Sequence, residues 1–212
     1  MQTVAVLDYG MSNLRSVAKA LAHVGDGCRI AVTDRPEDIL GADRLVFPGQ
    51  GAIGECMRNL SRLELREAVS ECVQNKPYLG ICLGLQCLME ESEEDRGTPG
   101  LGLIPGRVAR FPQGARGTDG RRLKIPHMGW NEVSQSRSHP LWAGIEPDAR
   151  FYFVHSYYVE PARPEDISGG TEYAVPFAAA VARDNVFAVQ FHPEKSQRAG
   201  LRLLANFLDW RP

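Results

Sequence analysis

Residues 78–84 of this 212-residue chain read Tyr78-Leu79-Gly80-Ile81-Cys82-Leu83-Gly84. The apolar run before Cys82 predicts a buried strand, and we expect a helix to begin directly after it. Glycines two residues before and two residues after the cysteine are typical of a nucleophile elbow, with cysteine in place of serine. Such a turn is too sharp for larger flanking side chains. It lifts the sulfur to the carboxyl edge of a sheet, beside a helix N-terminus whose free N–H groups and dipole favour a thiolate.

The segments around this elbow alternate between two hydrophobic patterns. Short apolar runs bounded by turn residues predict strands, and apolar residues three and four apart predict helices. Strand and helix in alternation argue for a parallel sheet that helices cover on both faces. The predicted strands are Val4–Leu7, Ile30–Val32, Leu45–Phe47 and Tyr78–Cys82. The predicted helices are Leu14–Leu21 with a stop at Gly25, Met57–Val73, and one that starts after Cys82 and runs through Leu85, Leu88 and Met89.

The second half of the chain reads mainly as strands without helices between them, which suggests an antiparallel extension of the sheet. The predicted strands here are Val108–Phe111, Lys124–Ile125, Phe151–Val159, Ala178–Arg183 and Phe187–Phe191, followed by a final helix at Gly200–Asp209, with a polar, glycine-rich surface loop at Gly114–Arg122. The predicted fold class is therefore α/β, with a mostly parallel central sheet flanked by helices and an antiparallel extension in the C-terminal half. We expect residues 1–212 to form a single domain.

Composition argues against several kinds of partner and location. A net charge of −2, with acids and bases mixed, gives no reason to expect nucleic acid or an anionic membrane as partner. The apolar run Val4–Leu7 is ended at once by Asp8, so it does not resemble a signal peptide, and no stretch approaches the roughly 18 apolar residues of a membrane span. The expected location is the cytosol. The five cysteines include no Cys-x-x-Cys pair, which predicts neither a zinc site nor a disulfide framework.

A second segment supplies the groups that could activate Cys82. An apolar strand ends at His192, and Pro193 keeps His192 extended. Residues i and i+2 of an extended chain point to the same side, so Glu194 can lie beside His192. An imidazole that takes a proton from a thiol needs a partner on its other nitrogen, which fixes the tautomer and stabilises the imidazolium. Cys82, His192 and Glu194 thus supply the three parts of an activated thiol nucleophile.

A third segment could stabilise the negative charge that develops when a thiolate attacks a carbonyl group. The apolar run Leu45–Phe47 is followed by Pro48-Gly49-Gln50-Gly51-Ala52, a turn that exposes backbone N–H groups at the same sheet edge. A tetrahedral intermediate needs two such donors. We expect one from the turn, at Gly51, and the other from the N–H of Leu83.

Each of these features also has an ordinary interpretation. Cys82 alone could be a core cysteine, His192 a histidine at a strand end, Glu194 a solvated acid and Gly49–Gly51 a plain tight turn. A tyrosine-phosphatase loop would need arginine at position 88, which is Leu88, and no Gly-Lys-Ser/Thr follows to make a P-loop. The joint occurrence of the three segments favours the catalytic interpretation.

Together the three segments resemble the class I glutamine amidotransferases of the triad type. Finer motifs look like one branch of that family, the glutaminase subunits of imidazole glycerol phosphate synthases. Those motifs are Asp8–Val17, Ile125–Asn131, His192–Ser196, Gln86 and the acidic run Glu90–Glu94, with Ser12 as a small departure where glycine is more usual.

The resemblance implies that the chain hydrolyses glutamine to glutamate and ammonia, without a metal or organic cofactor. It implies a heterodimer with a separate (β/α)8 cyclase subunit, which uses the ammonia to make imidazole glycerol phosphate and aminoimidazole carboxamide ribotide in histidine biosynthesis. Gln86 and Glu94 would hold the polar ends of glutamine, and the backbone around Ser156 and Tyr157 its α-carboxylate. The segment Ile125–Asn131 would form part of the partner interface.

Two alternatives stay open on sequence alone. One is a glutaminase subunit that serves another synthase, such as anthranilate synthase, although the segment Ile125–Asn131 argues against it. The other is a catalytically silent binding module on the same fold, which the intact set of cysteine, histidine and glutamate argues against.

The flexible Gly49–Gly51 turn further suggests that the oxyanion loop is misoriented until the partner binds.

Overall fold

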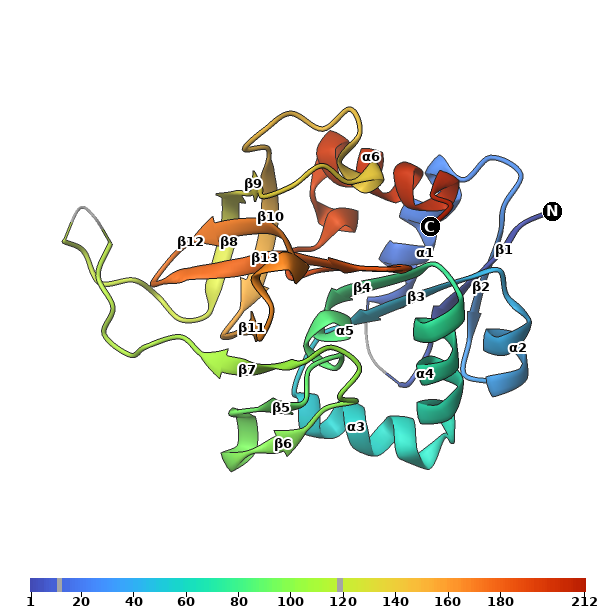
Figure 1. Cartoon of the computed structure of the whole chain (residues 1–212), viewed down its shortest axis with the longest axis horizontal. Helices are drawn as coiled ribbons and strands as arrows, with labels where there is room; N and C mark the ends of the chain where they lie inside the picture. Colours follow the sequence, from blue (N-terminus) through green and yellow to red (C-terminus); the bar gives the residue numbers. More distant parts are fainter. Residues whose placement is uncertain (11–12, 118–119) are drawn as a thin grey trace.

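The computed structural model describes residues 1–10, 13–117 and 120–212 (Figure 1). Met11 and Ser12 of the N-terminal motif, and Thr118 and Asp119 of the predicted loop, lie outside the described residues. Within the described ranges a twelve-stranded sheet runs through the molecule, and a separate two-stranded sheet lies beside it. None of the helices in these ranges is both long enough and apolar enough to cross a bilayer.

The parallel half of the large sheet carries the predicted strands in the order β2-β1-β3-β4-β14. All neighbouring pairs in this half are parallel, and Gly49 on β3 lies opposite Cys82 on β4. The carboxyl ends of β3, β4 and β14 therefore meet at one edge, which is where ligands bind in open α/β sheets. The strands are β1 (Thr3–Leu7), β2 (Arg29–Thr33), β3 (Arg44–Gly49), β4 (Tyr78–Cys82) and β14 (Val186–Val189).

The antiparallel extension is confirmed as well. From β14 the sheet continues through β13, β11 and β7, each pair antiparallel, and ends in the short strands β5 and β6, while β12 and β9 branch off β13. These strands are β5 (Glu91–Ser92), β6 (Thr98–Pro99), β7 (Gly106–Arg110), β9 (Ser134–Gln135), β11 (Tyr157–Pro161), β12 (Ile167–Glu172) and β13 (Pro176–Arg183).

Helices cover both faces of the parallel half, as expected. On β1, Val4 and Val6 pack into the cluster that includes α1 (Leu14–Val24) and α6 (Gln197–Asp209). Ala5 and Leu7 face the opposite cluster, because successive strand residues point to opposite faces. That cluster contains α2 (Pro36–Gly41), α3 (Ile53–Arg62) and α4 (Leu65–Asn75), and Figure 1 shows α3 and α4 across the sheet from α1 and α6. The short helix α2 was not predicted.

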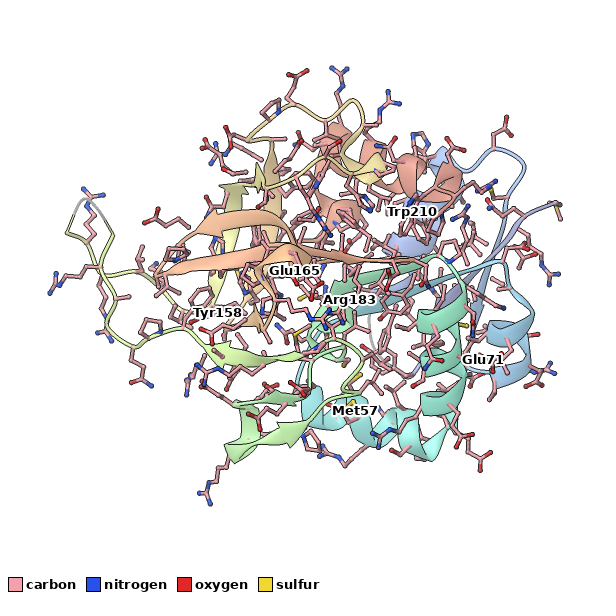
Figure 2. All side chains as sticks on the ribbon, in the orientation of Figure 1. Met57, Glu71, Tyr158, Glu165, Arg183 and Trp210 are labelled. Atoms are coloured by element: carbon pink, nitrogen blue, oxygen red, sulfur yellow. The ribbon has the colours of Figure 1, made fainter. Side chains whose placement is uncertain are left out.

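The single helix predicted at Met57–Val73 is wrong, because α3 ends at Arg62 and α4 begins at Leu65. Glu64, between them, has a left-handed backbone with φ 57°. Leu60 and Leu65 are both fully buried, yet five residues of continuous helix would set them about 140° apart around the axis. Breaking the helix brings both onto the core. Figure 2 labels one side chain on each of the two helices, Met57 on α3, which is buried, and Glu71 on α4, which is exposed.

The helix after Cys82 is shorter than predicted. It is α5 (Leu83–Gln86), and the chain then leaves the helical path although Leu88 and Met89 are fully buried. The carbonyl of Leu88 accepts hydrogen bonds from the N–H groups of Leu103 and Ile104, each at 2.9 Å. Backbone hydrogen bonds to a segment fifteen residues away thus replace those that would have continued the helix.

Two strand predictions in the second half are also wrong. Phe151–Val159 is not one strand but two, β10 (Arg150–His155) and β11, which bend apart at Ser156 and join different sheets. Apolar and aromatic residues lie on both sides of His155 and Ser156, so the sequence pattern reads as one strand and hides the bend. Lys124–Ile125 is not a strand; β8 (His127–Glu132) begins only after Pro126, which has no N–H to donate to a strand ladder, and pairs with β10. The loop at Gly114–Arg122 is confirmed in its described part, which is mostly exposed.

Candidate active site

Cys82 sits at the strand–helix junction that the sequence predicts. It is the last residue of β4, α5 begins at Leu83, and only 6% of Cys82 is exposed. Its φ of 53° is a conformation that a residue other than glycine adopts only where the surrounding structure holds it. The flanking glycines are steric requirements, since a Cβ on Gly84 would overlap the carbonyl oxygen of Phe47 and one on Gly80 would lie 2.8 Å from the carbonyl oxygen of Gly84.

His192 and Glu194 form the predicted pair. The Nδ1 of His192 lies 2.9 Å from the Oε1 of Glu194, and both side chains are almost completely buried. His192 is extended, as expected before a proline, but Pro193–Lys195 forms a 3-10 turn. The turn, and not a continuing extended chain, therefore brings the carboxylate back beside the imidazole. Ser196 anchors this turn, because its hydroxyl donates to the His192 carbonyl at 2.6 Å and accepts from the N–H of Tyr152 at 3.0 Å.

The environment of this pair makes His192 a stronger base than a free imidazole. Burial lowers the pKa of His192, but Cys82 and Glu194 raise it by more, to about 9. Burial raises the pKa of Glu194, but hydrogen bonds and charge from His192, with a hydrogen bond from Asn13, leave it below its usual value. The Nε2 of His192 is buried and makes no hydrogen bond of normal geometry to any residue within the described ranges, which leaves it free to exchange a proton with Cys82.

Asn13 is a contact of the pair that the sequence analysis did not single out. Its Nδ2 donates to Glu194 Oε1 at 2.9 Å, across 181 residues of sequence. Asn13 precedes α1 with φ 87°, a left-handed conformation that asparagine tolerates better than most residues. The left-handed backbone is the only local feature that marks Asn13, and the sequence pattern does not reveal that conformation. Asn13 and His192 share one carboxylate oxygen, so together they fix the orientation of Glu194.

A cavity of about 300 Å³ opens at the sulfur of Cys82. Every predicted site residue outside the His192–Glu194 pair lines it, and that pair is buried away from the lining. The lining residues are Gln50, Gly51, Cys82, Leu83, Gln86, Glu94, Pro126, Val154, His155, Ser156 and Tyr157.

The predicted oxyanion turn borders this cavity. Gly51 has φ 96°, which glycine adopts without strain, and its neighbour Gln50 places a buried Nε2 there with no partner among the described residues. Glu94 accepts a hydrogen bond at 2.8 Å from the N–H of Ile53, the first residue of α3. Burial raises the pKa of Glu94, although that hydrogen bond opposes the shift. Glu94 thus both lines the cavity and ties down the segment that follows the turn.

Gln86 is held within the protein and is not a surface residue. Its Nε2 donates to the carbonyl of Tyr157 at 3.0 Å and to the Oε1 of Gln190 at 3.2 Å. Both amide hydrogens are therefore used internally, which leaves the Oε1 of Gln86 as an acceptor for a ligand in the cavity.

Comparison with known proteins places these features in a family. Residues 5–210 match the family described as glutamine amidotransferase class-I. The chain is 60% identical over 213 residues to the imidazole glycerol phosphate synthase subunit HisH of Methylococcus capsulatus, a match that covers 100% of this chain and 98% of that protein. It is 58% identical to the subunit of the same name from Nitrosospira multiformis, with both proteins covered completely.

Solved structures share the fold. The glutaminase domain of CTPS from Trypanosoma brucei superposes with a TM-score of 0.65 at 19% identity, over 100% of this chain and 96% of that one. PurLQS from Thermotoga maritima gives a TM-score of 0.71 at 18% identity, over 98% of each chain. At such identities the likeness concerns the fold alone.

An elbow cysteine at the edge of a mostly parallel sheet, in a chain that matches this family almost end to end, defines the class: the protein belongs to the class I glutamine amidotransferases. Within that class it belongs to the HisH subunits of imidazole glycerol phosphate synthase. Both levels of the predicted resemblance are confirmed, and the anthranilate synthase branch is set aside.

Proposed function

We propose that this chain hydrolyses glutamine to glutamate and ammonia and passes the ammonia to a separate cyclase subunit. That subunit makes imidazole glycerol phosphate and aminoimidazole carboxamide ribotide in histidine biosynthesis. The observation that carries the proposal is the position of Cys82 on the wall of a cavity that Gln86 and Glu94 also line, in a chain that also holds His192 against Glu194. The membership of the chain in the HisH family supports the same function.

The proposed reaction begins with transfer of the Cys82 proton to the Nε2 of His192. The thiolate attacks the side-chain amide carbon of glutamine, and backbone N–H groups at Gly51 and Leu83 stabilise the resulting oxyanion. The intermediate collapses when His192 gives its proton to the leaving nitrogen, which departs as ammonia. The product on the enzyme is a γ-glutamyl thioester on Cys82.

The second half of the reaction releases glutamate. His192, now neutral, removes a proton from a water molecule, and the hydroxide attacks the thioester carbonyl. The oxyanion again sits at Gly51 and Leu83, and the Cys82 sulfur leaves as a thiolate. Glu194 stabilises the imidazolium in both halves, because its carboxylate accepts the Nδ1 hydrogen bond throughout.

The substrate contacts we propose follow the lining of the cavity. The Oε1 of Gln86 accepts from the ammonium group of glutamine, and Glu94 contributes a second acceptor. The backbone at Ser156 and Tyr157, where β10 bends into β11, holds the α-carboxylate. The position of the bend supports this role, since Ser156 belongs to neither strand and both Ser156 and Tyr157 line the cavity.

We propose that residues 1–212 act as one domain in the cytoplasm. Support for one domain comes from β4 and β14, which pair directly although they lie about a hundred residues apart, so that both halves of the chain build the site. All five cysteines are free thiols, which suits a reducing compartment.

We propose that β8 docks the cyclase. Met128 and Trp130 on this strand are 62% and 39% exposed, while His127 beside them is buried. Exposed large apolar side chains that are grouped on one strand often mark a protein interface. Pro126, directly before β8, lines the cavity, so a partner bound here lies next to the site where ammonia forms.

Replacing Trp130 with alanine should therefore weaken binding to the cyclase by about 2 kcal/mol, or roughly 30-fold in Kd, as expected for a buried aromatic side chain at an interface. Titration calorimetry with the purified cyclase measures it. Val32→Ala, which truncates an exposed apolar residue on the edge strand β2, is the matched control and should leave Kd unchanged. If Trp130→Ala bound the cyclase as tightly as Val32→Ala does, β8 would not be part of the interface.

Binding of the cyclase should also raise the rate of glutamine hydrolysis. Because Gly49–Gly51 carries an oxyanion donor on a glycine-rich turn, we expect the donor to be aligned only in the complex. Glutamate formation should rise roughly 5- to 150-fold when the cyclase and its nucleotide ligand are added, the range of ordinary allosteric coupling. Equal rates with and without the loaded cyclase would refute this regulation.

A further inference from the structure

Gln190 is a fully buried polar residue that the mechanism above does not use. It follows β14, and its backbone N–H donates to the carbonyl of Ala179 on β13 at 2.8 Å, so its position is fixed by the central sheet. It precedes His192 by two residues. Because alternate residues of an extended chain point to the same side, Gln190 and His192 both face the elbow.

The side chain of Gln190 lies between the nucleophile and a substrate-binding residue. Its Nε2 donates to the sulfur of Cys82 at 3.4 Å. Its Oε1 accepts from the Nε2 of Gln86 at 3.2 Å. Since Gln86 offers an N–H to Gln190, the amide of Gln190 must present its oxygen to Gln86 and its NH2 group to the sulfur. The hydrogen bond from Gln86 to the Tyr157 carbonyl continues the same network.

We propose that Gln190 is a further catalytic residue, which holds the reacting sulfur by donating a hydrogen bond to the Cys82 thiolate. The proposal rests on the proposed function, because it assigns a role in the same reaction. A hydrogen bond to a charged acceptor in a buried site is stronger than one to a neutral thiol, so the donor favours the reactive form. Unlike His192, the amide of Gln190 cannot give up its proton. It therefore stabilises the thiolate without converting it to a thiol.

The network also connects substrate binding to the nucleophile. Gln86, whose free oxygen faces the cavity, sets the orientation of Gln190, and Gln190 in turn sets the position of the sulfur. A buried glutamine with a purely structural role would need only a donor for its Oε1 and an acceptor for its Nε2, which many core groups could provide. In this protein the Nε2 of Gln190 donates to the sulfur of Cys82, the atom that attacks glutamine.

Two variants test the role. Gln190→Met keeps the length of the side chain and adds no charge, but it has no donor for the sulfur. Gln190→Leu removes both hydrogen bonds. We expect the rate of Cys82 alkylation by iodoacetamide at neutral pH to fall about tenfold or more in both, and its rise with pH to move to higher pH, since a hydrogen bond to a charged group of ordinary strength is lost. With the cyclase present, kcat for glutamine should fall by a similar factor while KM changes much less.

Peptide mapping by mass spectrometry assigns the alkylation to Cys82, and Thr171→Val is the control, because it removes a buried hydrogen bond to the Glu132 carbonyl outside the cavity. Alkylation of Thr171→Val should match the unaltered protein. If Gln190→Leu does not fold, Gln190→Met decides alone. Folded variants that alkylate at the original rate and with the original pH profile would overturn the role of Gln190. Alkylation requires no glutamine turnover, so a failure of the proposed function would appear separately, as absent hydrolysis in the unaltered protein.

Discussion

Cys82→Ala should abolish glutamine-dependent synthesis by the assembled enzyme while ammonia-dependent synthesis by the cyclase survives. The methyl group cannot form the thioester, and no other cysteine of the chain lines the cavity among the described residues. Loss of a nucleophile from a catalytic triad typically lowers kcat by about 10⁴-fold or more. Both activities are measured on the same preparation, with glutamine or an ammonium salt as the nitrogen source.

Cys28→Ala is the matched control, because Cys28 is only half-buried and does not line the cavity. It should retain full glutamine-dependent activity. Persistent glutamine turnover in Cys82→Ala would mean that another group is the nucleophile, and the assignment of the elbow would be wrong. Loss of the ammonia-dependent activity as well would instead indicate that the variant damages the partner.

Glu194→Gln should lower kcat for glutamine by about 10²- to 10⁴-fold, the range found when the acid of a catalytic triad becomes an amide. The amide keeps the shape of the side chain but not its charge, which contributes to the raised pKa of His192. The amide can also donate to Nδ1, and that would stabilise the wrong tautomer. Steady-state kinetics with the cyclase present measure the loss.

Asn13→Ala provides a graded comparison. It removes one hydrogen bond to the Glu194 carboxylate but leaves the carboxylate and its contact to His192 in place. We expect a loss of only about tenfold, consistent with one hydrogen bond to a charged group. Near-normal activity of Glu194→Gln would show that the carboxylate does not orient the base.

The parallel core was predictable because its signals are local. Each of its strands is a short apolar run ended by turn residues, and the elbow glycines at 80 and 84 have a direct steric cause. The positions of His192 and Glu194 were also readable, although a 3-10 turn and not an extended chain brings them together.

The remaining differences come from interactions that a local pattern does not contain. The helix after Cys82 stops early because the carbonyls of Cys87, Leu88 and Met89, directly after it, accept hydrogen bonds from the N–H groups of residues 101–104. The bend at Ser156 lies between two apolar, aromatic-rich runs that together read as one strand. Asn13 reaches Glu194 across 181 residues and Gln190 reaches Cys82 across 108, so only the assembled sheet reveals these contacts.

The most direct test of a thiol-based glutaminase is to trap the acyl intermediate. The complex with the cyclase and its ligand is mixed with glutamine, quenched in acid within the first turnovers, and mapped by peptide mass spectrometry. A glutamyl group on the peptide that contains Cys82, absent from Cys82→Ala, is the predicted result. Rapid glutamine turnover with an acyl group on a different residue, and none on Cys82, would contradict the account.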